Sequence, residues 1–438
     1  MDRIVDLIRS KRYSEEISPE DYERLITGFT LDEIPDAQMG ALLMAGVCNG
    51  FSANETNALT SAMLRCGEKL DLSEIDKVRV DCYSTGGVGD KTPLIAAPIA
   101  AAAGVAVPMI VERGTRHMIG SLEKLMAIPG FRTNLEVTDF ADLVKEFGLA
   151  FAEQSESLAP ADKRLYELRD ETATLESIEL IAASAMSKKL AEDLNGLIVD
   201  VKVSQDSLLS GRTEARRLAQ QLISIGRKLG VKVQVLLTDM EQPLGHTVGN
   251  ALEIMEVSQT LQGQGPTDLS GLAVELAARM IYISDTTISM DDAREKAASV
   301  IEDGSALQVL ASVIGAQGGD PEVLTDFVKL PNPQGALPIT SPRDGYVSKI
   351  NAEDIGRAAV LLGGGWPGPG EEGQHDPAVG IVIEAKVGQQ VFNNTGLCSL
   401  YYNDDTNLEE AQQLVEDAFR ISSMEPQQRN LVIDVIQG

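Results

Sequence analysis

Apolar residues recur at helical spacing through the first 66 residues of the chain. The pattern breaks at "SPED" and again at "IPDAQ", where proline and acidic residues separate one helical run from the next. This spacing predicts a small all-helical unit. Its apolar faces include Ile4, Ile8, Tyr22, Leu25, Ile26 and the run Met39–Val47.

From residue 77 onward, short apolar runs alternate with helical patterns. The segment Thr213–Leu229, with apolar residues along one face, is typical of the helical patterns that separate the short runs. Strands that alternate with helices favour a mostly parallel sheet covered by helices on both faces. The predicted strands are "KVRVDCY" (77–83), "VAVPMIV" (105–111), "GLAFAEQ" (148–154), "NGLIVDVKV" (195–203) and "VKVQVLLTD" (231–239).

One long helical block interrupts this alternation. Residues 161–193, "ADKRLYELRDETATLESIELIAASAMSKKLAED", show no strand pattern, and we expect them to return to the N-terminal helices and leave a cleft between two lobes. After Pro331 the sequence changes to turns and short strands. The predicted organisation is a helical lobe (1–68), an α/β lobe in two parts (69–160 and 194–335) separated by the returning helices (161–193), and a C-terminal α+β lobe (336–438).

The net charge narrows the choice of partners. The 438 residues are 43% hydrophobic and 24% charged, as in ordinary globular proteins, but the net charge is −29. An acidic surface repels nucleic acid and anionic membranes, so we expect neither as a partner. The N-terminal "MDRIVDLIRSKRYSEE" has no signal-peptide core, and the longest apolar run, Leu94–Val111, contains two prolines and predicts a buried helix followed by a strand.

Cysteine and histidine give no support for a common metal site. The four cysteines are scattered without CxxC spacing, and the three histidines lie far apart in the sequence. A zinc site and a Ser-His-Asp triad are therefore not expected. The same cysteine usage favours a reducing, cytoplasmic compartment.

A glycine-rich loop, "STGGVGD" (84–90), lies between the first predicted strand and an alanine-rich helix. Glycines let backbone N–H groups approach an anion, and the N-terminus of the following helix adds partial positive charge. The loop therefore suggests an anion site. A tight turn without a ligand is the alternative that spacing alone leaves open.

A second cluster lies in the returning helical block. Ser184 and Lys188 are four residues apart and share one helix face, and Arg169 ends the preceding helical run. Together they match the O4, N3–H and O2 edge of a uracil or thymine ring, and two cations would stabilise a base that leaves as an anion. Surface charges on a helix remain the alternative at this point.

A third loop, "VERGTRHMIGS" (111–121), follows the second predicted strand. Ligands of open α/β sheets bind beyond the carboxyl ends of the strands. Arg113, Arg116 and His117 would bring positive charge to this position. The alternative is that His117 packs and the arginines pair with nearby acids.

These stretches together resemble the thymidine and pyrimidine-nucleoside phosphorylase family over nearly the whole chain. "IPDAQMGALLMAG" is similar to the family's helical unit, "STGGVGD" to its phosphate loop, the block from "SLAPADKRLY" to "SKKLAE" to its base-binding region, and "LTDMEQPLGHTVGNALE" to a later segment. The resemblance implies a helical lobe, a large α/β lobe and a homodimer formed through the helical lobes. It also implies a transferase of nucleoside salvage, a pentosyltransferase that cleaves uridine- or thymidine-type nucleosides with phosphate to free base and pentose 1-phosphate.

The resemblance assigns roles to individual residues. Arg169, Ser184 and Lys188 match the base-binding residues, and Arg169 and Lys188 the catalytic cations. Tyr166 matches a tyrosine near the sugar and base, and Tyr83 stands where the family has a histidine that contacts both. The implied phosphate-binding residues are Ser84, Gly86, Gly87, Gly89 and Ser121, with Arg116 as an added cation.

Departures from the family pattern concentrate in the phosphate half. Cys82 replaces the family's phosphate-binding lysine, and Val111 replaces its serine. Glu112 brings a negative charge that we expect to repel an anion. The lost lysine alone removes a charge-assisted bond worth about 1.5–3 kcal/mol. The other replacements in this half include Tyr83, Pro93, Arg116, Ile119 and Ser204.

The resemblance also implies a potassium ion and no organic cofactor. Gly89, Leu244, Thr247 and Glu256 match the family's ion-binding positions. Lys91, two residues after Gly89, would place its ammonium near them and replace the ion.

Three functions stay open on the sequence. The first is phosphorolysis of a pyrimidine nucleoside. The second keeps the pyrimidine pocket but uses water, another anion or a phosphorylated substrate in the altered half. The third is a catalytically silent protein that binds pyrimidine. The sequence has no motif that distinguishes ribose from deoxyribose.

Overall fold

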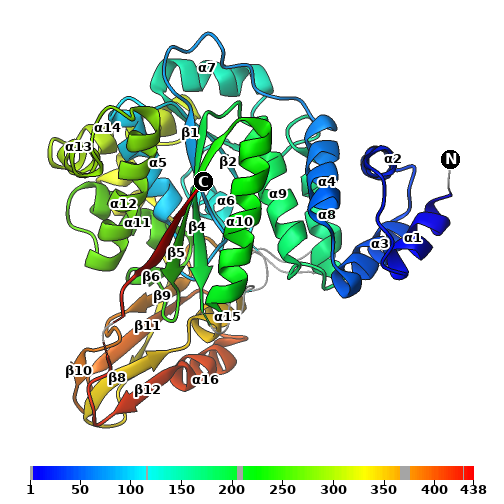
Figure 1. The fold of residues 1–438 in the computed structure, drawn as a ribbon. Helices are drawn as coiled ribbons and strands as arrows, with labels where there is room; N and C mark the ends of the chain where they lie inside the picture. The colour runs from blue at the N-terminus through cyan, green and yellow to red at the C-terminus, as the bar shows by residue number, and fades with distance from the viewer. Residues whose placement is uncertain (1–2, 115–116, 205–210, 366–374, 428) are drawn as a thin grey trace.

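A computed structural model of the chain describes residues 3–114, 117–204, 211–365, 375–427 and 429–438. Three lobes follow one another in space: helices around the N-terminus, a large α/β lobe in the centre, and a smaller α+β lobe below it (Figure 1). The predicted fold class, with a helical lobe, a mostly parallel sheet and a C-terminal α+β lobe, is confirmed.

The helical lobe begins with four amphipathic helices. Serine side chains cap two of them: Ser18 accepts from the Asp21 amide, and Ser52 forms a capping box with Glu55. Leu25, Phe29 and Ala62 are fully buried in the core of this lobe. The four helices are α1 (Ile4–Arg12), α2 (Pro19–Thr30), α3 (Asp36–Asn49) and α4 (Ala53–Arg65).

Two later helices complete this lobe. Leu165 and Leu168 of α8 (Pro160–Glu171), and Leu180 of α9 (Ile178–Ala191), join the same core as the N-terminal helices. Every residue of α9 is buried, because its other faces pack on the sheet of the large lobe. Residues of this block therefore reach the boundary between the two lobes, where the sequence predicted a cleft.

The large lobe contains all five predicted strands. They are β1 (Val80–Ser84), β2 (Val107–Val111), β3 (Leu149–Glu153), β4 (Gly196–Val203) and β5 (Lys232–Asp239). β1, β4 and β5 pair in parallel, and β2 pairs in parallel with β3. A parallel bridge between Arg79 and Ala106 links the two groups. The carboxyl ends of the strands therefore lie at one edge, where ligands of such sheets bind.

Helices cover both faces of this sheet, because side chains alternate along each strand. Ile198 packs into one core and Leu197 and Val199 into the other. The helices are α5 (Thr92–Ala102), α6 (Ser121–Met126), α7 (Val137–Phe147), α10 (Arg212–Leu229), α11 (Asn250–Leu261), α12 (Thr267–Ser284), α13 (Met290–Glu302) and α14 (Ser305–Ala316). In the described ranges no single helix has the length and apolar character to span a membrane, whereas α13 and α14, bent by 65°, meet that criterion only as a pair.

The C-terminal lobe is built from two small antiparallel sheets. Their orders are β10-β8-β12 and β6-β9-β11-β7. The 3-10 turns η1 (Pro321–Leu324) and η2 (Phe327–Lys329) precede this lobe and pack in the core of the large lobe. The elements of the C-terminal lobe are the strands β7 (Gly335–Thr340), β8 (Gly345–Ile350), β9 (Gly380–Ile383), β10 (Gln390–Val391), β11 (Gly396–Tyr402) and β12 (Phe419–Ser422), and the helices α15 (Ala352–Leu361) and α16 (Leu408–Ala418).

Two strands cross the predicted boundary of this lobe. β6 (Thr247–Val248) comes from the large lobe and pairs with β9. β13 (Val432–Gln437), at the end of the chain, leaves the C-terminal lobe and pairs with β5. The assignment of all residues 336–438 to one lobe is therefore wrong at its end, because Val435 and Ile436 pack with the large lobe's cores. In Figure 1 the C-terminus lies at the sheet of the large lobe.

Candidate active site

The glycine loop follows β1 at the carboxyl edge of the sheet. Gly86 and Gly89 have φ of +89° and +72°, a backbone region that favours glycine. The Ser84 hydroxyl donates to the Asp90 carboxylate and accepts from the Gly86 amide at 3.2 Å. Asp90 also accepts from the Thr92 amide and hydroxyl at 3.2 and 2.6 Å, so it joins the loop to the first residue of α5 and fixes the loop's shape.

Several charges surround the buried Asp90 carboxylate. Burial would raise its pKa, but Lys202, Ser84 and Thr92 outweigh burial and lower the pKa to about 2. The Lys202 ammonium lies 3.4 Å from Asp90 and 2.6 Å from Asp200. Asp90 is therefore an anion at neutral pH and part of the wall of the loop's own cavity.

The three residues predicted to bind a pyrimidine are brought together. Arg169 and Ser184 line a cavity with Tyr83 and Tyr166. The Lys188 ammonium lies behind this wall and donates to the Ser184 hydroxyl at 3.2 Å. The centroid of the Tyr166 ring lies near both cations, 5.9 Å from the Arg169 guanidinium carbon and 5.7 Å from the Lys188 nitrogen. The alternative of exposed surface charges is wrong, because all three side chains are buried.

Backbone carbonyls hold Arg169 in place. Its guanidinium donates to the oxygens of Leu175 at 3.0 Å and Leu180 at 3.3 Å. Burial lowers the pKa of the guanidinium, whose ordinary value is so high that it stays charged. The turn between α8 and α9 therefore orients the charge toward the cavity.

Two carboxylates hold Lys188. Its ammonium lies 2.8 Å from Asp162 and 2.5 Å from Glu112. Burial alone would lower the pKa of Lys188, but the two carboxylates outweigh it and raise the pKa above its ordinary value. Lys188 is therefore a permanent cation at neutral pH. The repulsion of an anion that we expect from Glu112 is therefore partly offset, because the Glu112 carboxylate is paired with Lys188.

Asp162 was missed by the sequence reasoning. It lies four residues before Tyr166 and seven before Arg169, so the three share one face of α8. Its carboxylate is 1% exposed and also accepts from the Gln154 amide at 2.7 Å. The helical spacing to Tyr166 and Arg169 was the signal that could have identified it.

A second cavity adjoins the first on the side of the glycine loop. Its wall includes Ser84, Gly86, Gly87 and Ser121, all four predicted to contact an anion. Tyr83, Thr85, Gly86, Gly87, Met118 and Tyr166 line both cavities and form the wall between them. Burial raises the pKa of Tyr83, so its phenol stays neutral at that wall. A ligand whose base lies in the first cavity would reach the glycine loop past these shared lining residues.

The charges of the second cavity differ from those of the first. Asp90 and Glu112 are among its lining residues, together with Lys189 and Arg113. Lys189 is held by Asp81 at 2.6 Å and Glu192 at 2.9 Å. The loop cavity therefore offers hydroxyl and backbone donors in a setting of balanced charge. Arg116, predicted as an added cation, lies outside the described residues.

Gly89, predicted for both the anion and the metal site, lies outside both cavity walls. It packs instead against the carbonyl oxygens of Leu244 and Thr247. Glu256 faces the same position, and the ammonium of Lys91 pairs with it. The predicted ion-binding residues are therefore brought together, with a lysine among them.

The third loop and the C-terminal lobe close the first cavity. His117 lines it, with Ala352 and Glu353 at the start of α15. The His117 ring nitrogen Nδ1 lies 4.0 Å from the Glu353 carboxylate. Arg113 lies 3.9 Å from Glu153. The contribution of the C-terminal lobe was not predicted, because no sequence pattern links residues 352–353 to the loop at 117.

Comparison with known proteins places the whole chain in one family. The sequence matches the glycosyl transferase family, a/b domain, over residues 76–307, the helical bundle domain of that family over 5–67, and the pyrimidine nucleoside phosphorylase C-terminal domain over 346–422. It is 40% identical to the pyrimidine-nucleoside phosphorylase of Geobacillus stearothermophilus over 434 residues, 99% of this chain and 100% of the relative. It is 39% identical to that of Bacillus subtilis (strain 168) over 421 residues, 96% of each chain.

A solved structure shares the fold. Anthranilate phosphoribosyltransferase (TrpD) from Thermus thermophilus matches with a TM-score of 0.59 at 17% identity, over 71% of this chain and 99% of that chain. Likeness at this identity concerns the fold alone.

Proposed function

The chain belongs to the pyrimidine-nucleoside phosphorylases of the glycosyl transferase family, and we propose that its two adjoining cavities are the base and phosphate sites of that reaction. The shared wall between a cavity with Arg169 and Ser184 and a cavity with the glycine loop carries this proposal. A nucleoside would place its base in the first cavity and the C1′ atom of its sugar at the wall. The relatives favour phosphorolysis over the other two functions that the sequence left open.

The first cavity supplies the leaving-group chemistry. As the bond between C1′ and the base breaks, its electron pair moves to the base, and negative charge develops on the ring oxygens and nitrogens. Arg169 and Lys188 are buried cations beside this position, and buried, preorganised charges stabilise such an anion strongly. The Ser184 hydroxyl, fixed by Lys188, adds a partner for the imide edge.

The second cavity supplies the acceptor. An oxygen of phosphate forms the new bond to C1′, which gives pentose 1-phosphate. Ser84, Gly86, Gly87 and Ser121 are the proposed contacts, since they line this cavity. With Cys82 where the family has lysine, we expect a phosphate KM about one to two orders of magnitude higher than a lysine would allow.

The test is cleavage of uridine and thymidine with and without inorganic phosphate. We expect free base and pentose 1-phosphate in equal amounts, in strict dependence on phosphate. Release of free pentose without phosphate would show that water is the acceptor. Pyrimidine binding by calorimetry, with no cleavage of either nucleoside, would show a silent binding protein.

The proposal includes a homodimer in the cytoplasm. Four large apolar side chains are exposed on two neighbouring helices. Val5 lies in α1, Tyr13 directly after it, and Met44 and Val47 lie in α3. Such side chains on neighbouring helices are typical of a covered surface. All four cysteines are free, which suits a reducing compartment. Analytical ultracentrifugation of the protein, and of a variant with Met44→Glu and Val47→Glu, tests the dimer; a wild-type monomer would contradict it.

A further inference from the structure

An oxygen-lined position lies between the glycine loop and the segment after β5. A Cβ added to Gly89 would lie 2.6 Å from the Leu244 oxygen and 3.0 Å from the Thr247 oxygen, so both carbonyls point at the loop. Glu256 of α11 faces the same position. Its carboxylate accepts from the His246 amide at 2.8 Å and the Thr247 hydroxyl at 2.9 Å.

The side chain of Lys91 ends at this position. Its ammonium donates to the Thr247 carbonyl at 2.9 Å, to the Thr247 hydroxyl at 3.0 Å and to the Glu256 carboxylate. A second carboxylate, that of Glu253, lies 3.8 Å away. The Lys91 side chain is fully buried. The three N–H groups of the ammonium therefore have oxygen partners, and the carboxylate of Glu256 has its countercharge.

A potassium ion does not fit this arrangement. It would have to share the Thr247 and Glu256 oxygens with a buried ammonium of the same charge. Like charges repel strongly in a buried site, where water does not screen them. We propose that the Lys91 ammonium is a built-in cation that takes the place of a monovalent metal ion, so that the glycine loop is held in shape without potassium.

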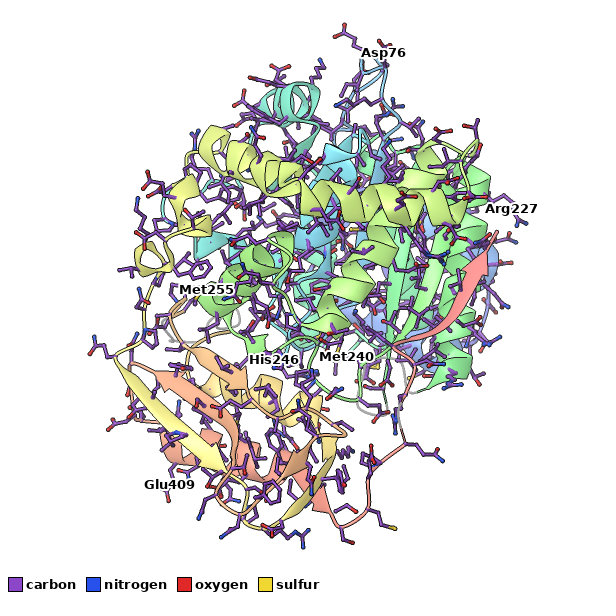
Figure 2. The ribbon with its side chains drawn as sticks, turned by 90° about the vertical axis from the view of Figure 1, so that its left-hand side faces the viewer. Asp76, Arg227, Met240, His246, Met255 and Glu409 are labelled. Atoms are coloured by element: carbon purple, nitrogen blue, oxygen red, sulfur yellow. The ribbon has the colours of Figure 1, made fainter. Side chains whose placement is uncertain are left out.

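The position of this cation explains what it would do. Lys91 follows the glycine loop directly and is the N-cap of α5. Thr247 pairs with Val382 of the C-terminal lobe, and the His246 ring contacts the Ile383 carbonyl at 2.7 Å. Figure 2 shows His246 where the large lobe meets the C-terminal lobe. The Lys91 ammonium thus ties the loop that separates the two cavities to the junction of the lobes.

The inference deepens the proposed function, because it concerns the same loop. Its main readout is thermal unfolding, so its failure is distinguishable from a failure of phosphorolysis. The first arm measures the Tm of the wild-type protein in potassium chloride and in tetramethylammonium chloride at equal ionic strength. We expect equal Tm values and equal nucleoside cleavage in the two salts. A higher Tm or a faster rate in potassium would overturn the proposal.

The second arm uses Lys91→Thr, which opens the position and adds a hydroxyl. In tetramethylammonium its Tm should fall by about 5 to 10 °C, because Glu256 is left buried without a countercharge. Potassium should restore the Tm in a saturable way. Thallium(I), a potassium analogue, should bind the crystallised variant beside Gly89 and give anomalous scattering there. A folded variant that responds equally to both salts would overturn the proposal.

Two matched variants separate a cation site from a merely broken ion pair. Lys11→Thr breaks another buried lysine–carboxylate pair, with Glu55 at 2.6 Å in the helical lobe. Its Tm should fall without recovery in potassium. Lys91→Thr with Glu256→Gln removes both charges and should also show no potassium response. Should Lys91→Thr not fold, thallium soaked into wild-type crystals decides, since bound thallium beside Gly89 would contradict the proposal.

Discussion

The base cavity and the glycine-loop cavity share a wall but treat charge differently. On the base side, Arg169 and Lys188 are buried with fixed partners, beside the position that we propose for the leaving base. On the loop side, the lining acids Asp90 and Glu112 are themselves paired to lysines. One half thus holds buried cations, which in the proposed reaction would stabilise an anion as it forms. The other half balances its charges before a ligand arrives.

Glu112 connects the two halves. It extends from the end of β2 into the wall of the loop cavity, yet its carboxylate lies against Lys188 of the base side. A change at the loop cavity should therefore affect Lys188, which we propose stabilises the leaving base. A substitution in one half should therefore change the electrostatic potential in the other half. The following variants test how far the functions of the two halves can be separated.

Lys188→Ala tests the base half and should have the largest effect. We expect kcat to fall by about 10³-fold or more, because a preorganised cation at the leaving base is lost. The phosphate KM should rise less than kcat falls, because Glu112, which lines the loop cavity, loses its countercharge. Steady-state kinetics with uridine, varying each substrate, measures both. An unchanged kcat would remove Lys188 from the mechanism.

The control for Lys188→Ala addresses stability. Removing Lys188 leaves Asp162 buried and unpaired, which costs about 3–5 kcal/mol. Lys11→Ala in the helical lobe breaks a pair of comparable burial, with side chains 3% and 2% exposed against 1% and 1%. It should lower the free energy of unfolding to a similar extent and leave kcat unchanged. A similar loss of kcat in both variants would mean that the effect of Lys188 is structural.

Cys82→Lys with Tyr83→His tests the loop half by restoring the family's residues. A new charge-assisted bond to phosphate is worth about 1.5–3 kcal/mol, so the phosphate KM should fall about 10- to 100-fold. Cys82→Ser serves as the control, because it changes the side chain without adding charge. No change in phosphate KM would mean that Glu112 and the third loop, rather than the missing lysine, set the affinity.

Asp90→Asn removes the charge of the glycine loop's buried carboxylate and tests how much that charge stabilises the fold. The pKa of Asp90 is about 2 in the folded protein, against about 3.9 in an unfolded chain. A lowered pKa stabilises the protein above pH 3.9, by about 2–3 kcal/mol, and this contribution is lost as the pH falls toward 2. The free energy of unfolding of Asp90→Asn should therefore be lower than wild type at pH 7.

The pH dependence provides the control for Asp90. The difference between wild type and Asp90→Asn should be constant from pH 7 to about 5 and shrink below about pH 4. Asp303→Asn, at an exposed carboxylate that Ser305 hydrogen-bonds, should differ from wild type only slightly. Denaturant unfolding across the pH range measures all three proteins. A difference that grows as the pH falls would contradict a lowered pKa.

Much of the fold could be predicted because the spacing of apolar residues along the sequence agrees with the side chains that are buried in the structure. β4 is buried throughout and is apolar except for Asp200 and Lys202, which pair with each other, so it has the apolar character of a strand in a parallel sheet. The return of residues 161–193 was visible because no strand pattern interrupts them. The placement of β13 was missed although its Val and Ile residues are typical of a strand, because no local pattern shows that it pairs with the edge of β5 in another lobe.

In the candidate site, too, local spacing predicts some contacts and not others. Arg169, Ser184 and Lys188 lie on two consecutive helices, so local spacing was enough to bring them together. The pairing of Glu112 with Lys188, and the approach of Glu353 to His117, join residues that are 76 and 236 positions apart. Such contacts depend on how lobes pack, which no local pattern records. Sequence reasoning therefore gave Glu112 its charge correctly but not its partner.

Glu112→Gln is the smallest change that acts on both halves. It removes a negative charge from the wall of the loop cavity, so the phosphate KM should fall about 3- to 10-fold, as expected for one partly paired charge near an anion. Lys188 keeps Asp162 at 2.8 Å, so kcat should stay within about threefold. Glu409→Gln, exposed at the start of α16 in the C-terminal lobe and outside both cavities, removes the same charge at a distance and should leave the phosphate KM unchanged. Equal effects of the two variants would mean that the net charge of the protein, rather than the pocket, sets phosphate affinity. A fall in kcat with Glu112→Gln alone would instead mean that Glu112 positions Lys188, and that the two halves of the site work as one unit.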